Sequence, residues 1–178
     1  FNEAPAVELF IGSVFDTLKS SCDLELEIIF VNDGSTDGTL DVLLRCQSKS
    51  PAIRVVDLSR NFGKEAALTA GLVAARGDVV IPIHVDLQDP LDVIPLMVEK
   101  WREGFEVVLA RRVDRGADSW AKRMSANWFY KIHNLLAMPR LPVNVGDFRL
   151  MDRIVVEVVK TLPESHRFMK GLFAWVGF

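Results

Sequence analysis

The distribution of apolar residues along the chain predicts four strands. Nearly continuous apolar runs cover residues 26–32, 53–58 and 79–84, and a fourth strand is expected over residues 106–110. In the first three runs apolar residues do not alternate cleanly with polar ones. Such runs are typical of strands that are covered on both faces. The pattern therefore predicts a sheet that is buried between two layers.

Helical periodicity occupies the intervals between these strands. Apolar residues recur on one helix face over residues 5–19, and further helices are expected over residues 39–48, 65–75 and 90–103. Arg76-Gly77 follows the third helix and Gly104 follows the last, as is usual at helix C-termini. Strands that alternate with helices predict an α/β domain with a mostly parallel central sheet flanked by helices.

Length and composition restrict this interpretation further. A chain of 178 residues, 49% hydrophobic and 25% charged, fits one folded domain over residues 1–178. The net charge of −3 gives no indication of nucleic-acid binding. No apolar run reaches about 18 residues, so no membrane-spanning helix is expected. Cys22 and Cys46 lack metal-type spacing and are expected to be free thiols.

Ligands of open α/β sheets bind outside the carboxyl ends of the strands, which directs attention to three turns. The first turn reads VNDGSTDGT (31–39). In it, Asp33 leaves the strand and Gly34 permits a tight turn. Ser35 or Thr36 is expected to cap the next helix.

The second turn reads SRNFGKEAALTAG (59–71), in which Asn61 and Gly63 shape the loop. Lys64 then stands at the N-terminus of a helix, a place that already favours anions. A lysine at this position adds a positive charge suited to phosphate. The second turn is therefore a candidate phosphate-binding loop.

The third turn lies in IPIHVDLQDP (81–90), where an apolar strand runs into oxygen-bearing side chains. Asp86 and Gln88 are two residues apart, so on an extended segment they would point the same way. Their oxygens are ligands that Mg²⁺ or Mn²⁺ prefers, and these ions usually also bind substrate phosphates. Asp89 is expected to cap the following helix, with Pro90 at its first position. Each turn alone has an ordinary structural explanation, but three at one sheet edge favour a shared site.

Together with FNE (1–3), GDFRL (146–150) and HRFMKGLFAWVGF (166–178), these motifs resemble those of family-2 glycosyltransferases. The branch most resembled is that of the polyprenyl-phosphate glycosyltransferases, which includes bactoprenol glucosyltransferases. The resemblance covers essentially the whole chain. It implies a GT-A-type nucleotide-binding domain and a divalent metal, Mg²⁺ or Mn²⁺. It also implies an inverting transfer of a hexose from a nucleotide sugar, expected to be a UDP-hexose, to a polyprenyl phosphate.

The resemblance also assigns roles to individual positions. It implies Asp86 and Gln88 as metal ligands and Asp86 and Asp147 as catalytic residues, Asp147 lying in a loop on the acceptor side. Arg123 and Arg149 are candidate partners of the acceptor phosphate, although either can equally be a surface arginine. The nucleotide-binding residues that it implies are Phe1, Glu3, Asp33, Asn61, Gly63, Lys64 and Asp86.

Two features depart from the family pattern. His84 stands where the family usually has the first Asp of its D-x-D motif. This histidine either supports the site through hydrogen bonds, shifts the metal preference towards Mn²⁺ or other transition metals, or marks a weakened enzyme. The family's first strand would precede Phe1, and its absence is expected to leave neighbouring strands unpaired.

Residues 119–139 form an aromatic and basic amphipathic stretch, which is the candidate membrane-contacting segment of the chain. It is expected to lie in a membrane interface, or else to pack on the domain as an ordinary helix. The resemblance implies transmembrane helices beyond residue 178, so this chain is expected to be a soluble piece of a protein at the cytoplasmic face of a membrane.

Two other functions stay open at this point. A sugar-phosphate nucleotidyltransferase shares an α/β nucleotide-binding sheet, but it would carry a glycine-rich basic loop directly after its first strand. Here the motif NDGSTDG follows a later strand. A degenerate, non-catalytic nucleotide-binding domain is the other alternative, and His84 is its main support.

Overall fold

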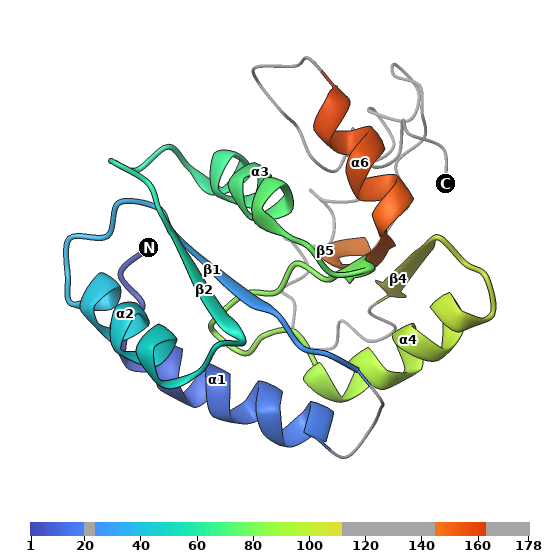
Figure 1. Ribbon diagram of the computed structural model, residues 1–178, viewed down its shortest axis with the longest axis horizontal. Coiled ribbons are helices and arrows are strands. Elements are labelled where there is room, and N and C mark those ends of the chain that lie inside the picture. The colour runs from blue at the N-terminus through green and yellow to red at the C-terminus, as the bar shows by residue number, and fades with distance from the viewer. Residues whose placement is uncertain (20–23, 112–144, 163–178) are drawn as a thin grey trace, which may run out of the picture.

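The computed structural model describes residues 1–19, 24–111 and 145–162 (Figure 1). Strands β1 (Ile28–Asn32) and β2 (Ile53–Asp57) pair in parallel, in a register that sets Ile28 opposite Ile53. Around them lie three helices, α1 (Ala4–Lys19), α2 (Thr39–Lys49) and α3 (Lys64–Ala74). All five elements match the predicted ones in type, and their bounds shift by one to two residues.

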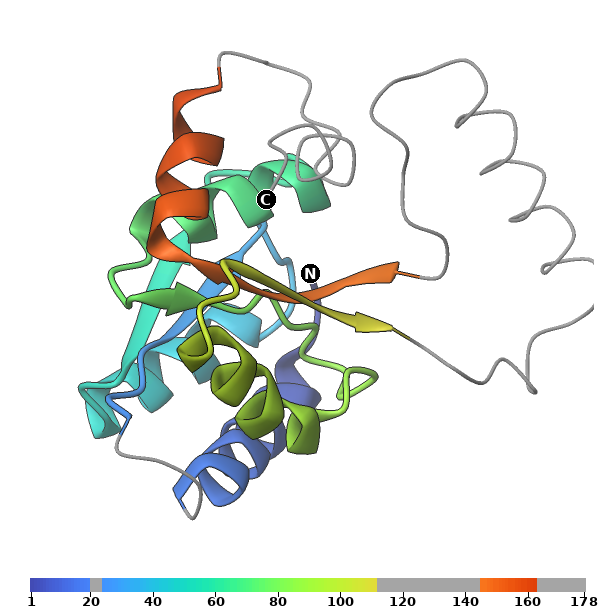
Figure 2. The same ribbon diagram turned by 90° about the vertical axis from the view of Figure 1, so that its right-hand side faces the viewer.

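A second group of strands lies beside the first. Strand β5 (Val145–Asp152) pairs antiparallel with β3 (Val79–Val80) on one side and with β4 (Val107–Arg111) on the other. Figure 2 shows β4 running alongside β5. The 3₁₀ turn η1 (Leu91–Val93) leads into α4 (Ile94–Arg102), and α6 (Arg153–Thr161) follows β5 directly.

The α/β class agrees with the prediction, but the pairing is more mixed than expected. Among the described strands, only β1 and β2 pair in parallel, because β5 enters the sheet antiparallel to both of its neighbours. The strand expected over residues 79–84 is shorter, since only Val79 and Val80 have ladder partners on β5. The GDFRL segment, expected as a loop, belongs to β5.

Apolar side chains form a core on each side of the strands. The larger cluster joins α1, α2 and α4 to β1 and β2, and includes Phe10, whose ring meets Phe30 edge-to-face with 5.9 Å between centroids. The smaller cluster joins α3 to α6, where valines recur at helical spacing. Helices α1 and α2 therefore cover one face and α3 the other, as Figure 1 shows. The smaller cluster consists of Leu72, Met151, Val155, Val156 and Val159.

A cavity of about 1000 Å³ lies between the two groups of strands, lined by both β1 and β3. Within the described residues, β1 has only β2 as a sheet neighbour and β3 has only β5. The expectation that a further strand precedes Phe1 stays a prediction. No helix in residues 1–19, 24–111 and 145–162 combines the length and apolarity needed to cross a membrane.

Candidate nucleotide and metal site

The N-terminal segment is bound to the first turn through Asn2. The Asn2 amide donates to Ser35 Oγ (3.0 Å), and the Thr36 amide donates to Asn2 Oδ1 (2.9 Å). The Glu3 amide donates to Thr39 Oγ1 (2.9 Å). The prediction that Ser35 or Thr36 caps α2 is wrong: its N-cap is Gly38, without a side-chain bond, because both hydroxyl residues face Asn2.

Asp33 joins the first turn to the second. Its side chain is buried, with Oδ1 accepting from the Phe62 amide (2.7 Å) and Oδ2 from the Gly63 amide (2.9 Å). Gly63 has φ +92°, a conformation that favours glycine, and it directly precedes α3. Asp33 therefore fixes the loop that presents Lys64, and its contact with a base stays a prediction.

Two buried polar residues at the first turn were not predicted from the sequence. Asn32, buried at the end of β1, donates from Nδ2 to Asp57 Oδ1 (2.7 Å) and accepts from the Ser35 amide (3.2 Å). Thr39 is also buried, and its hydroxyl bonds Asp37, which lowers the pKa of that carboxyl. A polar residue closing an apolar strand was the available indication for Asn32, since a buried amide needs hydrogen-bond partners.

The third turn differs from the predicted extended segment. Residues 85 and 86 form a turn, and Leu87 has φ +57°, in the left-handed region that non-glycine residues rarely adopt. Asp86 Oδ1 accepts from the Gln88 amide (3.2 Å). The prediction that Asp86 and Gln88 point the same way from an extended strand is therefore wrong in its geometry. Asp86 and Gln88 are nevertheless both exposed.

Asp89 does not cap a helix. The N-cap of η1 is Pro90, with no side-chain bond, so the predicted positions of both residues are wrong. The Asp89 carboxylate instead turns back to His84, where Oδ2 accepts from the backbone amide (3.1 Å) and lies 3.0 Å from the ring Nδ1. Asp89 is 8% exposed, whereas the His84 side chain is 45% exposed. The Asp89 carboxylate thus stabilises the turn that follows His84 and does not cap a helix.

The three turns and the N-terminal segment meet at one cavity. Its lining includes most of the residues predicted from the family resemblance, together with His84, while its inner wall is apolar. Lys64 begins α3 at this cavity, so its charge adds to the positive end of the helix. The predicted residues that line the cavity are Phe1, Glu3, Asp33, Asn61, Gly63, Lys64 and Asp86.

Four predicted residues are not among those lining the cavity. Gln88 lies two residues from Asp86 on the third turn. Arg149 is buried on β5, opposite Leu109, so the surface alternative for this arginine is wrong. Asp147 also belongs to β5 by its backbone, but its side chain lies outside the described part, as does the whole of Arg123.

A divalent metal ion fits this site if the protein and the substrate phosphates coordinate it together. Residues 1–19, 24–111 and 145–162 contain no group of three or more His, Cys, Asp or Glu side chains arranged to hold a metal ion. Asp86 offers an exposed carboxylate at the cavity, with the amide side chain of Gln88 on the same turn. Mg²⁺ is usually bound by one or two carboxylates plus substrate phosphates, and these residues are suited to that arrangement.

Comparison with known proteins decides the family. The model of the family described as "Glycosyl transferase family 2" matches residues 1–159. The chain belongs to glycosyl transferase family 2. It is 50% identical over 179 residues to a "Prophage bactoprenol glucosyl transferase homolog" of Escherichia coli K12, covering 99% of this chain and 58% of the relative. It is 51% identical to a "Bactoprenol glucosyl transferase" of Shigella phage SfV, covering 99% and 57%.

This family-2 chain thus spans somewhat more than half the length of these relatives. Among solved structures it is similar to a mannosyltransferase from Pyrobaculum calidifontis in complex with GDP-Man and Mn²⁺. The TM-score is 0.57 at 24% identity, covering 89% of this chain and 44% of the other. This likeness concerns the fold, and it supports the predicted GT-A-type α/β architecture.

Proposed function

We propose that this chain forms the donor-binding part of an enzyme that transfers a hexose from a nucleotide sugar, UDP-hexose by preference, to a polyprenyl phosphate. The main support is the convergence of three strand-end turns and the N-terminal segment on one cavity that carries Lys64 and Asp86. The second support is 50% identity to a bactoprenol glucosyl transferase homolog. The membrane surface and the cytoplasmic side belong to the proposal, since the acceptor is a membrane lipid.

The proposed transfer needs little acid–base chemistry. A phosphate oxygen of the acceptor attacks C1 of the hexose, the bond from C1 to the donor diphosphate breaks, and the nucleoside diphosphate leaves with the electron pair. The acceptor phosphate is already an anion, so alignment and charge neutralisation matter more than a strong base. Inversion at C1 follows from attack on the face opposite the leaving group.

Donor-side roles are proposed for the turns. Lys64 and the N-terminus of α3 would neutralise the diphosphate, while Asp33 and Asn61 hold the nucleotide side of the cavity. Asp86, with Gln88, would hold Mg²⁺ or Mn²⁺, and such an ion supplies charge stabilisation for the departing diphosphate. The complex of the Pyrobaculum enzyme with GDP-Man and Mn²⁺ supports a divalent ion in this fold.

Acceptor-side roles are proposed for Asp147, Arg123 and Arg149. One arginine can donate two parallel hydrogen bonds to a phosphate group. Arg123 and Arg149 would therefore suit the phosphate of a polyprenyl phosphate. Asp147 and Arg149 are two positions apart along the backbone of β5. Because alternate positions of a strand share a face, this spacing is consistent with a joint role on the acceptor side.

Transfer of labelled glucose from UDP-glucose to polyprenyl phosphate by the intact protein tests the proposal. We expect a lipid-linked product that is lost with EDTA and restored by Mn²⁺ or Mg²⁺. Asp86→Ala should lower the rate by about 100-fold or more, because it removes the carboxylate at the diphosphate. Asp92→Ala, an exposed change outside the cavity, serves as the control.

Two outcomes would count against the proposal. If no metal supports transfer from a nucleotide sugar, the enzymatic function fails. If the protein binds UDP and Mn²⁺ in an Asp86-dependent manner but transfers no sugar, the non-catalytic alternative replaces it.

A further inference from the structure

The side chain of Asp89 closes a short loop at the cavity. One of its oxygens, Oδ2, receives both the backbone amide of His84 (3.1 Å) and the ring Nδ1 of the same residue (3.0 Å). We call this pair of contacts, with the residues 84–89 that it encloses, the 84–89 clasp. Since Asp89 is buried, the carboxylate is a fixed anchor, and the exposed histidine is the part that it holds.

The loop inside the clasp is strained. Leu87 adopts φ +57°, where its Cβ crowds the backbone, and such conformations persist only when the surroundings enforce them. The contact from the Gln88 amide to Asp86 Oδ1 (3.2 Å) lies within the same loop. Asp86 is therefore presented by a turn whose two ends are tied together through His84 and Asp89.

The contact also settles which nitrogen of the imidazole ring carries the proton. A carboxylate accepts hydrogen bonds only, so Nδ1 acts as the donor to Asp89. The neutral ring then carries its lone pair on Nε2, on the side away from Asp89. Among the residues lining the cavity are both His84 and Asp86.

We propose that His84 is a positioning residue, which acts through the 84–89 clasp to hold Asp86 in place for the metal and diphosphate. The inference rests on the proposed function only in its use of the metal. It gives a physical role to the histidine that stands at the first position of the D-x-D motif, without making it a ligand. Residues that orient a metal ligand typically change metal affinity by about 10- to 100-fold when removed.

Substitutions of His84 separate its two nitrogens. Asn at this position can place an N–H near the site of Nδ1 and so keep the contact with Asp89. Gln reaches instead towards the site of Nε2. The intact protein, loaded with UDP, is titrated with Mn²⁺, and free Mn²⁺ is measured by electron paramagnetic resonance.

We expect H84Q and H84A to weaken Mn²⁺ binding by about tenfold, whereas H84N stays within about twofold of the original protein. Binding of UDP without metal should not change, because the turns at Asp33 and Lys64 are untouched. D92A is the matched control, since Asp92 is exposed nearby and does not line the cavity. Thermal unfolding of each variant verifies that the fold is retained.

Three results would overturn the inference. Equal loss of Mn²⁺ affinity in H84N and H84Q would make the ring itself a ligand. Unchanged affinity in H84A and H84Q would make the clasp irrelevant to the metal. A ¹⁵N spectrum in alkaline buffer that places the His84 proton on Nε2 would show that Nδ1 does not donate to Asp89.

The ¹⁵N spectrum and the Mn²⁺ titration together distinguish this inference from the proposed function. If the His84 proton is on Nδ1 but the protein binds no Mn²⁺ in the presence of UDP, the clasp exists without a role in metal binding. The inference then fails. If Mn²⁺ binds as expected but no sugar is transferred, the clasp stands and the enzymatic proposal alone fails.

Discussion

At the scale of single residues, Gly34 shows how closely the first two turns approach. Its φ is +63°, and a Cβ built on it would lie 2.3 Å from the backbone carbonyl carbon of Arg60. The neighbour is backbone and cannot swing aside. Glycine is therefore needed here both for its conformation and for the missing side chain.

Gly34→Ala should lower the free energy of unfolding by about 2 kcal/mol or more, because a left-handed alanine is strained and its methyl group also clashes. Urea unfolding of the variant measures the change. Gly12→Ala is a matched control: Gly12 lies inside α1, and a methyl group added there would meet no atom within 4 Å, so the variant should gain about 0.5–1 kcal/mol. Equal effects at the two glycines would refute the close approach.

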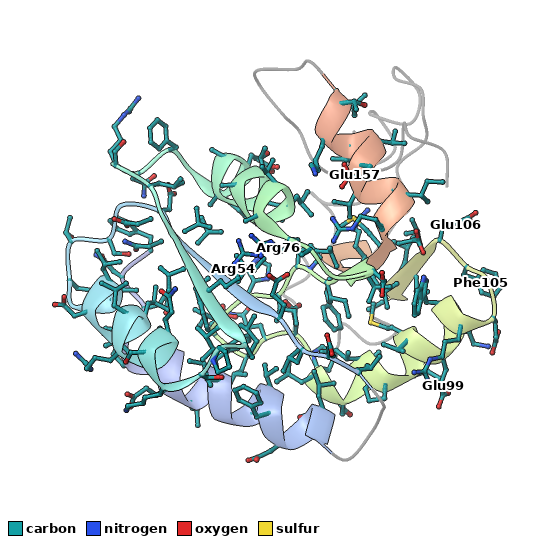
Figure 3. All side chains as sticks on the ribbon, viewed as in Figure 1. Arg54, Arg76, Glu99, Phe105, Glu106 and Glu157 are labelled. Atoms are coloured by element: carbon teal, nitrogen blue, oxygen red, sulfur yellow. The ribbon has the colours of Figure 1, made fainter. Side chains whose placement is uncertain are left out.

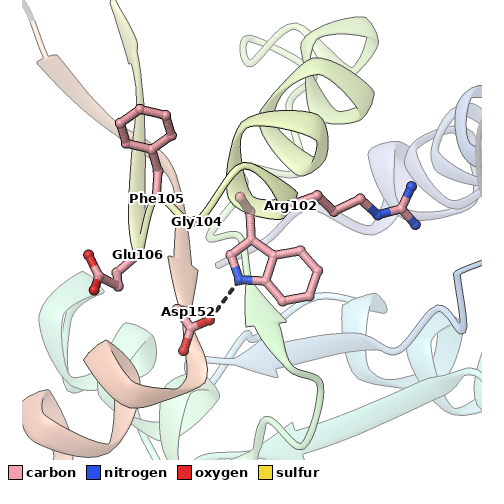
Figure 4. Close-up of a pocket in the computed structure, with 6 residues that line it drawn as sticks. Arg102, Gly104, Phe105, Glu106 and Asp152 are labelled. Atoms are coloured by element: carbon pink, nitrogen blue, oxygen red, sulfur yellow. Dashed lines mark hydrogen bonds between the residues drawn. The ribbon is translucent and has the colours of Figure 1, made fainter.

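At the scale of elements, Asp152 connects α4 to the junction of β5 and α6. Its Oδ2 accepts from Trp101 Nε1 (2.6 Å), and its Oδ1 accepts from the Ile154 amide (2.8 Å) as the N-cap of α6. Trp101 and Asp152 line a small cavity of about 360 Å³ together with Phe105 and Glu106 (Figure 4). One carboxylate thereby joins a helix that covers the sheet to a helix that follows it.

Asp152→Ala should cost about 2 kcal/mol of unfolding free energy, since it removes both a helix cap and the partner of the indole N–H. Asp152→Ser should cost about half as much, because serine caps well but is too short to reach Trp101. Chemical unfolding, with tryptophan fluorescence as the probe, measures both variants. An equal loss in the two would mean that the cap contributes nothing.

At the scale of the whole molecule, a charged network ties the start of β1 to β2 and to the segment after α3. Glu27 accepts from Arg54 Nη1 (2.5 Å) and from the Arg76 amide (2.9 Å), and Arg54 also donates to the Ala74 carbonyl (2.9 Å). Figure 3 shows Arg54 and Arg76 close together in the middle of the molecule. Burial raises the pKa of Glu27, but the hydrogen bonds and positive charges of Arg54 and Arg76 outweigh it, and the pKa falls below 4.5.

Glu27→Gln should destabilise the protein by about 1–2 kcal/mol near neutral pH, since the charge-assisted contacts are lost. A lowered carboxyl pKa contributes stability that is present above the unfolded value of 4.5 and is lost as the pH falls through the folded value. The difference between the two proteins should therefore shrink as the pH falls below about 4.5.

Urea unfolding over a pH series measures this dependence. Glu99→Gln, on the exposed face of α4, is the control and should change stability little at any pH. A Glu27→Gln difference that is the same at neutral and acid pH would show that the charge of this carboxyl is not involved.

Apolar periodicity was enough to predict the order and type of most elements, because it directly reflects which faces are buried. The sequence also identified the turns that meet at the cavity, since glycine and short polar residues at strand ends predict where ligands bind. Lys64 and Asp86 were named on these grounds, and the structure brings both to the same cavity.

The hydrogen-bond partners of these side chains, in contrast, depend on how the chain folds in three dimensions. The fate of Asp89 depended on a backbone turn at Leu87 that no local pattern predicts, since a non-glycine residue rarely takes that conformation. The insertion of β5 between β3 and β4, and the link from Asp33 to Phe62 and Gly63, join segments far apart in the chain. Sequence patterns record which residues are buried or turn, but hydrogen-bond partners across such distances are set by packing.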